Sequence, residues 1–228
     1  MKSRNTSAKI RMSTDKRTYT YESVPVLTLS TTYPNVRLRG APEVESRINC
    51  RIQTEVADFL CNASNVLYRQ AVQGYQYARK NGFPFNPYDA VMQYEVTYNQ
   101  NCHLSVYVDE YLYTGGAHGN TLRSSDTWDL YDGCAMTLSA LFEPDFDYRG
   151  MLTAQLIRQA DRNMQENPGI YFEEYRDLIL MNFNEESFYL TPEGLAIYFQ
   201  QYEIAPYASG IIVFTIPYET LGWRPSCK

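Results

Sequence analysis

The sequence predicts an α+β fold, in which an antiparallel sheet with a long N-terminal helix is followed by a second, smaller α+β sub-domain. Two observations favour this class. One long amphipathic helical pattern lies early in the chain, and alternating strand patterns lie both after it and near the end. The 228 residues suffice for one large domain or two small ones with a buried core.

The first elements are a strand and the long helix. Val24–Ser30 alternates and is β-branched, and Pro25 places this strand at a sheet edge or at a strand start. Tyr33-Pro34-Asn35 predicts a turn. From Pro42 to about Arg79 apolar residues recur every three or four positions, which predicts a helix lying across a sheet. Such a helix would measure about 55 Å, and the pattern leaves room for a break near Cys61–Ser64.

The remaining elements follow in a regular order. Three strands form a meander: one carries Met92 to Tyr98, the next runs to Tyr113, and the third covers Arg123–Tyr131. A short helix at Thr137–Phe142 comes next, followed by two helices and then by three more strands. These last five elements are expected at residues 147–165, 171–182, 188–190, 195–202 and 211–216.

Charge divides the chain unevenly and excludes one class of partner. The net charge is −6 and the isoelectric point is near 5.0, which argues against a nucleic-acid-binding protein. Residues 1–17 nevertheless hold six basic residues and one acid. We expect a basic flexible arm there, which is either a solvated tail or a weak attachment to an anionic surface. The two sub-domains are predicted at residues 18–132 and 133–228.

The apolar runs and the cysteines indicate in which cellular compartment the protein is expected. Apolar runs such as Ile211–Phe214 are far too short to span a bilayer, and no secretory signal is present in this sequence. The five cysteines form no Cys-x-x-Cys pair and have irregular spacing, so we expect reduced thiols and neither a zinc site nor a disulfide framework. As the chain is written, these features favour the cytoplasm.

The sequence offers little for catalysis. It contains two histidines and no metal, nucleotide or nucleophile motif, so no cofactor and no metal are expected. His103 follows Cys102 directly, and on a strand the two side chains would point to opposite faces. The acidic residues allow many carboxylate pairs, but no spacing singles one out.

A glycine-rich loop is the first candidate binding site. It contains Tyr113, Gly115, Gly116, His118 and Asn120. Three glycines within five residues permit positive φ and expose backbone N–H groups, so the loop could hold an anion or accept a partner's backbone. The other interpretation is a strained hairpin connection whose histidine only caps the turn. His118 is also a weak catalytic candidate, as a general base with Ser124, Ser125 or Asp126.

The second candidate is the loop Tyr202–Gly210. Pro206 and Gly210 restrict its backbone, and Tyr207 could project from it. A rigid tyrosine on a preformed loop loses little side-chain entropy on binding. The alternative is a packed turn between neighbouring strands.

Three strings of residues resemble one bacterial family. YTGGAHGNT, TWDLYDGCAMTLSALF and GLAIYFQQYEIAPYASGIIVFTIPY are similar to the RsiV-type domain of unknown function, from about Tyr94 to Tyr218. This resembles the extracellular, lysozyme-sensing part of an anti-sigma factor, and similar modules accompany a peptidoglycan deacetylase. The chain departs from the sensing members because it lacks a sigma-binding segment and a membrane span.

The resemblance implies a non-enzymatic sensing module with two sub-domains. Its expected partner is a muramidase-type protein or a cell-wall component, and the residues of both loops would lie on or near the binding rim. Members of this family usually lie outside the cell, so the resemblance also favours an extracellular or cell-surface location if the true start lies upstream. A peptidoglycan-directed hydrolase that uses His118 is the alternative function. A third is a structural protein that assembles through its 21 tyrosines; the sequence leaves the oligomeric state open.

Overall fold

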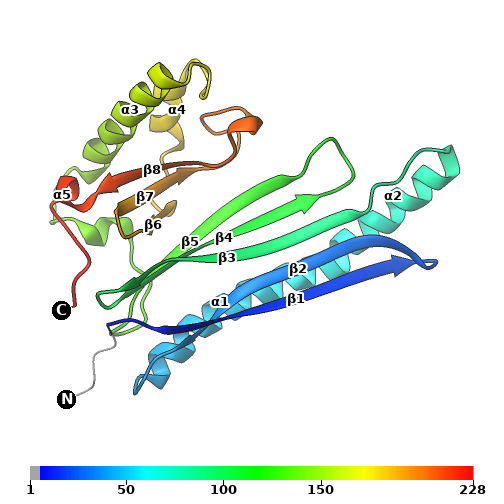
Figure 1. Cartoon of the computed structure of the whole chain (residues 1–228), viewed down its shortest axis with the longest axis horizontal. Helices are drawn as coiled ribbons and strands as arrows, with labels where there is room; N and C mark the ends of the chain where they lie inside the picture. Colours follow the sequence, from blue (N-terminus) through cyan, green and yellow to red (C-terminus); the bar gives the residue numbers. More distant parts are fainter. Residues whose placement is uncertain (1–5, 228) are drawn as a thin grey trace. The chain divides into compact units, whose positions relative to one another are not determined.

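The computed structural model describes residues 6–227, and these form an α+β fold with two sheets (Figure 1). The first sheet has five strands in the order β1-β2-β3-β4-β5 and is mostly antiparallel, and the second has three in the order β6-β7-β8. This confirms the predicted class and the second sheet. Across residues 6–227, no helix is long and apolar enough to pass through a membrane.

Strand β1 (Lys9–Tyr21) corrects the prediction of a flexible arm over residues 1–17. It pairs antiparallel with β2 (Val24–Arg37) along its whole length. Alternating threonine and tyrosine from Thr18 to Tyr21 favour a strand, and the basic side chains are tolerated because they lie at an exposed sheet edge. Residues 1–5 of the predicted arm lie outside the described residues.

Strand β2 begins one residue before Pro25, which confirms a strand start at this proline. The β1–β2 register shifts between Tyr19 and Thr20, opposite Pro25, so a bulge accommodates the residue that cannot donate a hydrogen bond. The predicted turn at Tyr33-Pro34-Asn35 is wrong, because these residues continue β2. Here Pro34 lies opposite Met12, beyond the last residue of β2 that pairs with β3.

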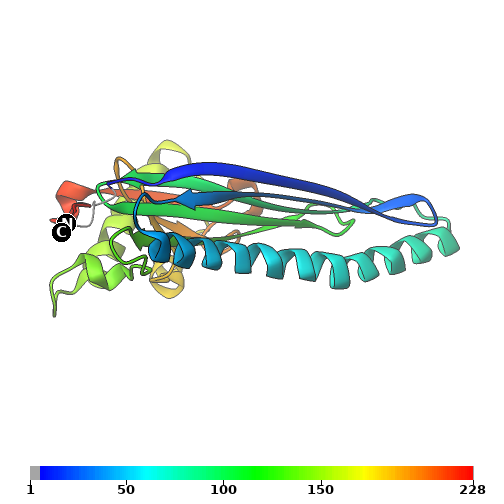
Figure 2. The ribbon, with the colours of Figure 1, turned by 90° about the horizontal axis from the view of Figure 1, so that it is seen from below.

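The long helix forms as predicted, but it is not the first element, because β1 and β2 precede it. It consists of α1 (Pro42–Asn62), the π-helical segment η1 (Ala63–Leu67) and α2 (Tyr68–Asn81), and Figure 2 shows it along one face of β1 and β2. The π-helical segment lies where the break was expected. Gly82 ends the helix in the left-handed conformation. The helix connects β2 to β3 (Tyr88–Gln100), which are therefore parallel.

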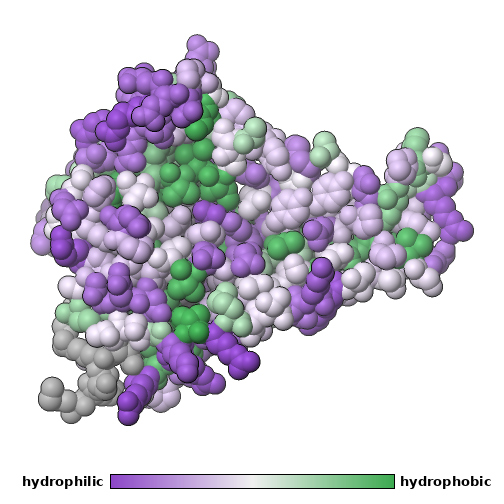
Figure 3. Space-filling view, in the orientation of Figure 1, coloured by the Kyte–Doolittle hydropathy of each residue, from purple (hydrophilic) through white to green (hydrophobic). Residues whose placement is uncertain are grey.

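The meander is confirmed as β3, β4 (His103–Tyr113) and β5 (Asn120–Asp129). The turn between β3 and β4 places Asn101 and Cys102 at positive φ, as a tight hairpin requires. The face of the sheet turned away from the helix is mostly polar, and Figure 3 shows it with only small hydrophobic spots. One covered face and one solvated face are usual for antiparallel sheets.

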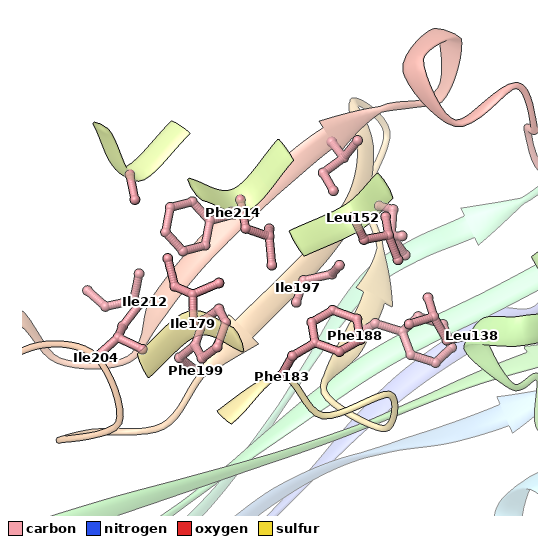
Figure 4. Packing of buried hydrophobic residues seen from close by; sticks show 14 of the residues in the cluster. Leu138, Leu152, Ile179, Phe183, Phe188, Ile197, Phe199, Ile204, Ile212 and Phe214 are labelled. Carbon is pink, nitrogen blue, oxygen red and sulfur yellow. The ribbon is translucent and has the colours of Figure 1, made fainter. Parts of the chain in front are cut away.

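The C-terminal half forms a second layer of helices on a sheet. It contains the 3₁₀ turn η2 (Leu138–Leu141), α3 (Tyr148–Glu166) and α4 (Tyr175–Asn182). These are followed by β6 (Phe188–Leu190), β7 (Gly194–Phe199), the 3₁₀ turn η3 (Tyr207–Ser209), β8 (Ile212–Pro217) and α5 (Tyr218–Leu221). Leu152, Ile179, Ile197 and Phe214 pack together between these helices and strands (Figure 4).

The chain divides into two compact units, but not into the consecutive sub-domains that the sequence predicts. Among the described residues, one unit contains 6–8, 96–107 and 123–227, and the other contains 9–95 and 108–122. The division cuts β3, β4 and β5, because the meander contributes residues to both units. A boundary drawn along the sequence at residue 132 could not represent this arrangement.

A disulfide joins Cys102 to Cys227, with their Cα atoms 5.1 Å apart. This corrects the expectation that all five cysteines are reduced. Cys50, Cys61 and Cys134 keep their thiols, and they are exposed rather than buried as small apolar residues. The paired cysteines are 125 residues apart, so no local spacing could have revealed the bond.

Candidate functional site

The glycine-rich loop between β4 and β5 is shaped by contacts that two of its glycines make. Gly115 has a φ of +84°, and a Cβ there would lie 3.5 Å from the carbonyl oxygen of Asn86 and 3.6 Å from the Tyr88 ring. Gly119 is buried against the Tyr111 ring, and a Cβ at this position would lie 2.5 Å from the Tyr111 hydroxyl oxygen. Glycine is therefore favoured at both positions, by conformation at Gly115 and by space at Gly119.

The other predicted residues of the loop lie at or near the surface. Gly116 and His118 are exposed, and nothing lies within 4 Å of a Cβ built on Gly116. The Tyr113 hydroxyl donates a hydrogen bond to the Gly116 carbonyl oxygen at 2.9 Å, which ties the loop to the end of β4. The His118 Nδ1 lies 3.0 Å from the Gly119 carbonyl oxygen. Asn120 is exposed at the start of β5.

An aromatic cluster supports this loop within the same compact unit. It consists of Tyr21, Tyr75, Phe85 and Tyr88, with successive ring centroids 6.2, 5.4 and 6.4 Å apart. Gly74 on α2 permits close approach, because its Cβ would lie 3.3 Å from the Tyr88 hydroxyl oxygen. The segment between α2 and β3 contributes to both features, because its Phe85 ring is one member of the cluster and its Asn86 carbonyl faces Gly115.

The loop that carries Tyr207 is held by polar contacts at both of its ends. The Gln200 side-chain amide bonds both backbone groups of Arg123, accepting from the N–H at 2.9 Å and donating to the carbonyl at 2.6 Å. Glu203 accepts the Gln200 N–H, and burial raises the pKa of its carboxyl group. At the other end, the Ser209 hydroxyl donates to the Ile170 carbonyl oxygen at 2.8 Å.

Two tyrosines form the outer part of this second loop. Tyr202, which has a φ of +68° and is 52% exposed, lies 5.8 Å from Tyr207 between ring centroids. Pro206 precedes the short 3₁₀ turn that contains Tyr207, and both residues are partly buried. The glycine-rich loop and the Tyr207 loop belong to different compact units. Whether they form one binding surface stays a prediction.

The structure reveals a carboxylate pair that no spacing in the sequence singled out. Glu55 on α1 accepts a hydrogen bond from the buried Tyr94 hydroxyl and an ion pair from Arg51 at 2.8 Å. Burial raises the pKa of Glu110 on β4, and the charge of Glu55 adds to this effect. The hydrogen bond between Tyr94 and Glu55 joins the helix to the sheet. A pattern search misses Glu55 and Glu110 because they come from separate elements.

The structure also places the side chains that the sequence suggested for metal binding or catalysis. Within residues 6–227, no three His, Cys, Asp or Glu side chains are grouped so that they could hold a metal ion. His103 is 3% exposed, and its Nδ1 lies 2.7 Å from the Asn101 carbonyl oxygen. Ser125, a suggested partner of His118, donates its hydroxyl to the Phe188 carbonyl oxygen at 2.6 Å.

Two family models match the chain, one in each half. Residues 21–121 match a model described as deacetylase PdaC. Residues 139–219 match a model described as a protein of unknown function, DUF3298. No curated protein matches the chain significantly.

Two crystal structures share the fold. A DUF3298-family member from Bacteroides fragilis is 19% identical, with a TM-score of 0.69, and the match covers 96% of this chain and 94% of that one. A DUF3298-family protein from Pseudomonas aeruginosa is 16% identical, with a TM-score of 0.61 and the same two coverages. These structures show that the chain shares the fold of two DUF3298-family proteins.

Proposed function

We propose that this chain is a non-enzymatic sensing module that binds a muramidase-type protein or a cell-wall component through its glycine-rich loop, with the Tyr207 loop as a second contact. The PdaC and DUF3298 matches suggest a cell-wall-associated module of unknown function. The finer assignment to the RsiV-type family, with an anti-sigma-like role, belongs to this proposal.

The observation that carries the proposal is the way the glycine-rich loop is fixed. Gly119 lies under a tyrosine ring and Gly115 lies against the aromatic cluster, so the loop needs no partner to define its shape. A preformed loop loses little conformational entropy on binding, which favours recognition of another macromolecule. Gly116 and His118 are exposed on this loop, so a partner such as an enzyme can reach them.

Calorimetric titration against a panel of muramidases and soluble peptidoglycan fragments tests the proposal. We expect saturable binding to at least one panel member. His118→Ala and Tyr207→Ala should each weaken it by about 30-fold if they are hot spots. Lys80→Ala and Tyr131→Ala are controls, because both residues are exposed and lie outside the two loops. The absence of binding across the whole panel would contradict the sensing function.

The hydrolase is retained as a second candidate because the model matching residues 21–121 is described as a deacetylase. If His118 donates Nδ1–H to the Gly119 carbonyl, its Nε2 carries the lone pair that a general base needs. Incubation with muropeptides and analysis by mass spectrometry would detect turnover. Turnover that His118→Ala abolishes would favour the hydrolase, whereas an inactive parent protein would exclude it.

We also propose a location outside the reducing cytoplasm. The Cys102–Cys227 disulfide supports this choice over the cytoplasmic alternative, because such bonds persist in oxidising compartments. Fractionation of cells that produce the protein from its native locus, with detection by antibody, tests the location. Recovery of the whole pool in the cytoplasm with all thiols reduced would contradict it.

A further inference from the structure

We propose that the outer edge of β1 binds an extended, acidic polypeptide segment by strand addition. In this mode the backbone of the partner pairs with the free edge of a sheet, and its alternating side chains provide specificity. The proposal concerns a surface that is separate from both loops, and it does not depend on the proposed function.

The first argument is the availability of the edge. Of the strands in residues 6–227, β1 is terminal in the five-stranded sheet, so only its inner side pairs with another strand. The register with β2 runs without interruption from Lys9 to Tyr19. This strand of 13 residues contains no proline and its bulge is confined to one end. A partner therefore meets a long, regular row of backbone donors and acceptors.

The second argument is charge. Lys9, Arg11 and Lys16 are exposed on β1, and the remaining basic residue, Arg17, pairs with Asp15 at 2.6 Å. The edge therefore carries three positive charges that no acid of the same strand balances, in a protein whose net charge is −6. Opposite charges placed directly across two strands stabilise the pair, and like charges destabilise it. An acidic strand fits this edge, and a basic one does not.

The third argument is the distribution of the charges over both faces of the strand. The Thr14 and Thr32 hydroxyl oxygens lie 3.4 Å apart on the open face of the sheet, and Lys16 shares that face by alternation. The Tyr19 ring lies 5.8 Å from Tyr68 on α2, so Tyr19 and Arg11 share the helix face. A flat anionic surface can reach only one of these sets, whereas an added strand projects side chains to both.

The same charges disfavour a second copy of β1 as the occupant. Two copies paired edge to edge would place a strand with a net charge of +3 against an identical one. Lysines on exposed edges are a common protection against such self-association. Two copies of β1 therefore repel each other, whereas an acidic strand can still pair with the outer edge of β1.

The test uses the full chain and a fluorescein-labelled peptide of alternating Glu and Thr, about twelve residues long to match β1. We expect a saturable rise in fluorescence anisotropy, together with slower amide hydrogen exchange in β1. Arg11→Glu combined with Lys16→Glu should weaken binding about tenfold. Lys80→Glu combined with Arg158→Glu changes the net charge equally at exposed sites elsewhere, and it should leave affinity within about twofold.

Three comparisons could overturn the proposal. An acidic peptide of equal charge that is interrupted by prolines cannot form a strand, so equal binding of this peptide would refute strand addition. Binding to phosphatidylglycerol vesicles without binding to the acidic peptide would assign β1 to an anionic surface. Sedimentation that shows dimers lost in the Arg11→Glu and Lys16→Glu variant would assign the edge to a second copy. The proposal stands if only the uninterrupted acidic peptide protects β1.

Discussion

Removal of the Cys102–Cys227 disulfide should destabilise the protein strongly. The bonded residues are 125 positions apart, so the bond restricts more than half of the unfolded chain. The loop-closure relation gives about 5 kcal/mol for a loop of this length at 25 °C, and natural disulfides usually deliver about 2–4 kcal/mol. We therefore expect the Cys102→Ser and Cys227→Ser double variant to lose about 2–5 kcal/mol in its free energy of unfolding.

Urea unfolding followed by circular dichroism measures this loss. With a slope of about 2 kcal/mol per molar urea, the midpoint should fall by about 1–2.5 M. Addition of dithiothreitol should shift the parent protein in the same way and leave the double variant unchanged. Cys50→Ser combined with Cys134→Ser is the matched control, because both thiols are exposed and outside the bond.

Thiol counting provides an independent readout of the same bond. In denaturant without reductant, the parent protein should expose three reactive thiols out of its five cysteines. Five reactive thiols in protein purified from an oxidising compartment would refute the bond. An unchanged urea midpoint in the double variant would refute the stabilising role even if the bond forms.

Four further substitutions test packing and charge. Gly119→Ala should cost about 1 kcal/mol of stability, because the Tyr111 ring must move, and Gly116→Ala should cost nothing comparable; urea unfolding of both variants checks this. Gly194→Ala should cost about 3 kcal/mol, because its Cβ would lie 2.7 Å from a backbone carbonyl carbon of β8; equal stability of the variant would contradict this packing. The pKa of Glu110 is raised in the folded state. The contribution of this carboxyl group to the free energy of unfolding is therefore complete below its ordinary pKa of 4.5, and it is lost as the pH rises through the raised pKa. Glu110→Gln should therefore lose less stability than the parent between pH 4 and pH 8, and parallel pH profiles would contradict the raised pKa.

Local patterns predicted the elements well where one physical preference dominates. The apolar stripe of the long helix, its first-turn proline and its final glycine agree with the helix from Pro42 to Asn81. The short strand Phe188–Leu190 was found at its observed bounds, because turn-forming residues flank an apolar run. In both cases the signal lies within a few turns of the chain and needs no distant partner.

The features that the sequence did not predict depend on distant partners or on competing local signals. Charge in residues 9–17 suggested disorder, but pairing with β2 stabilises a strand there. Pro34 suggested a turn, yet it lies in β2 at a position without a β3 neighbour, where the missing donor costs little. The Glu55–Glu110 pair and the disulfide join residues from separate elements, so no window of the sequence contains either of them.

Salt dependence separates the two binding surfaces of the unit that contains residues 9–95 and 108–122. Near the aromatic cluster Arg79 pairs with Glu22 at 2.6 Å, and residues 113–120 contain no Lys, Arg, Asp or Glu, so binding at the glycine-rich loop should depend on shape and apolar contact. The β1 edge relies on exposed positive charges, whose attraction is screened beyond about 8 Å at physiological ionic strength. An increase in salt should therefore weaken the acidic peptide strongly and a loop-bound muramidase little. If both ligands weaken equally, they share the basic edge, and the glycine-rich loop does not form a separate binding site.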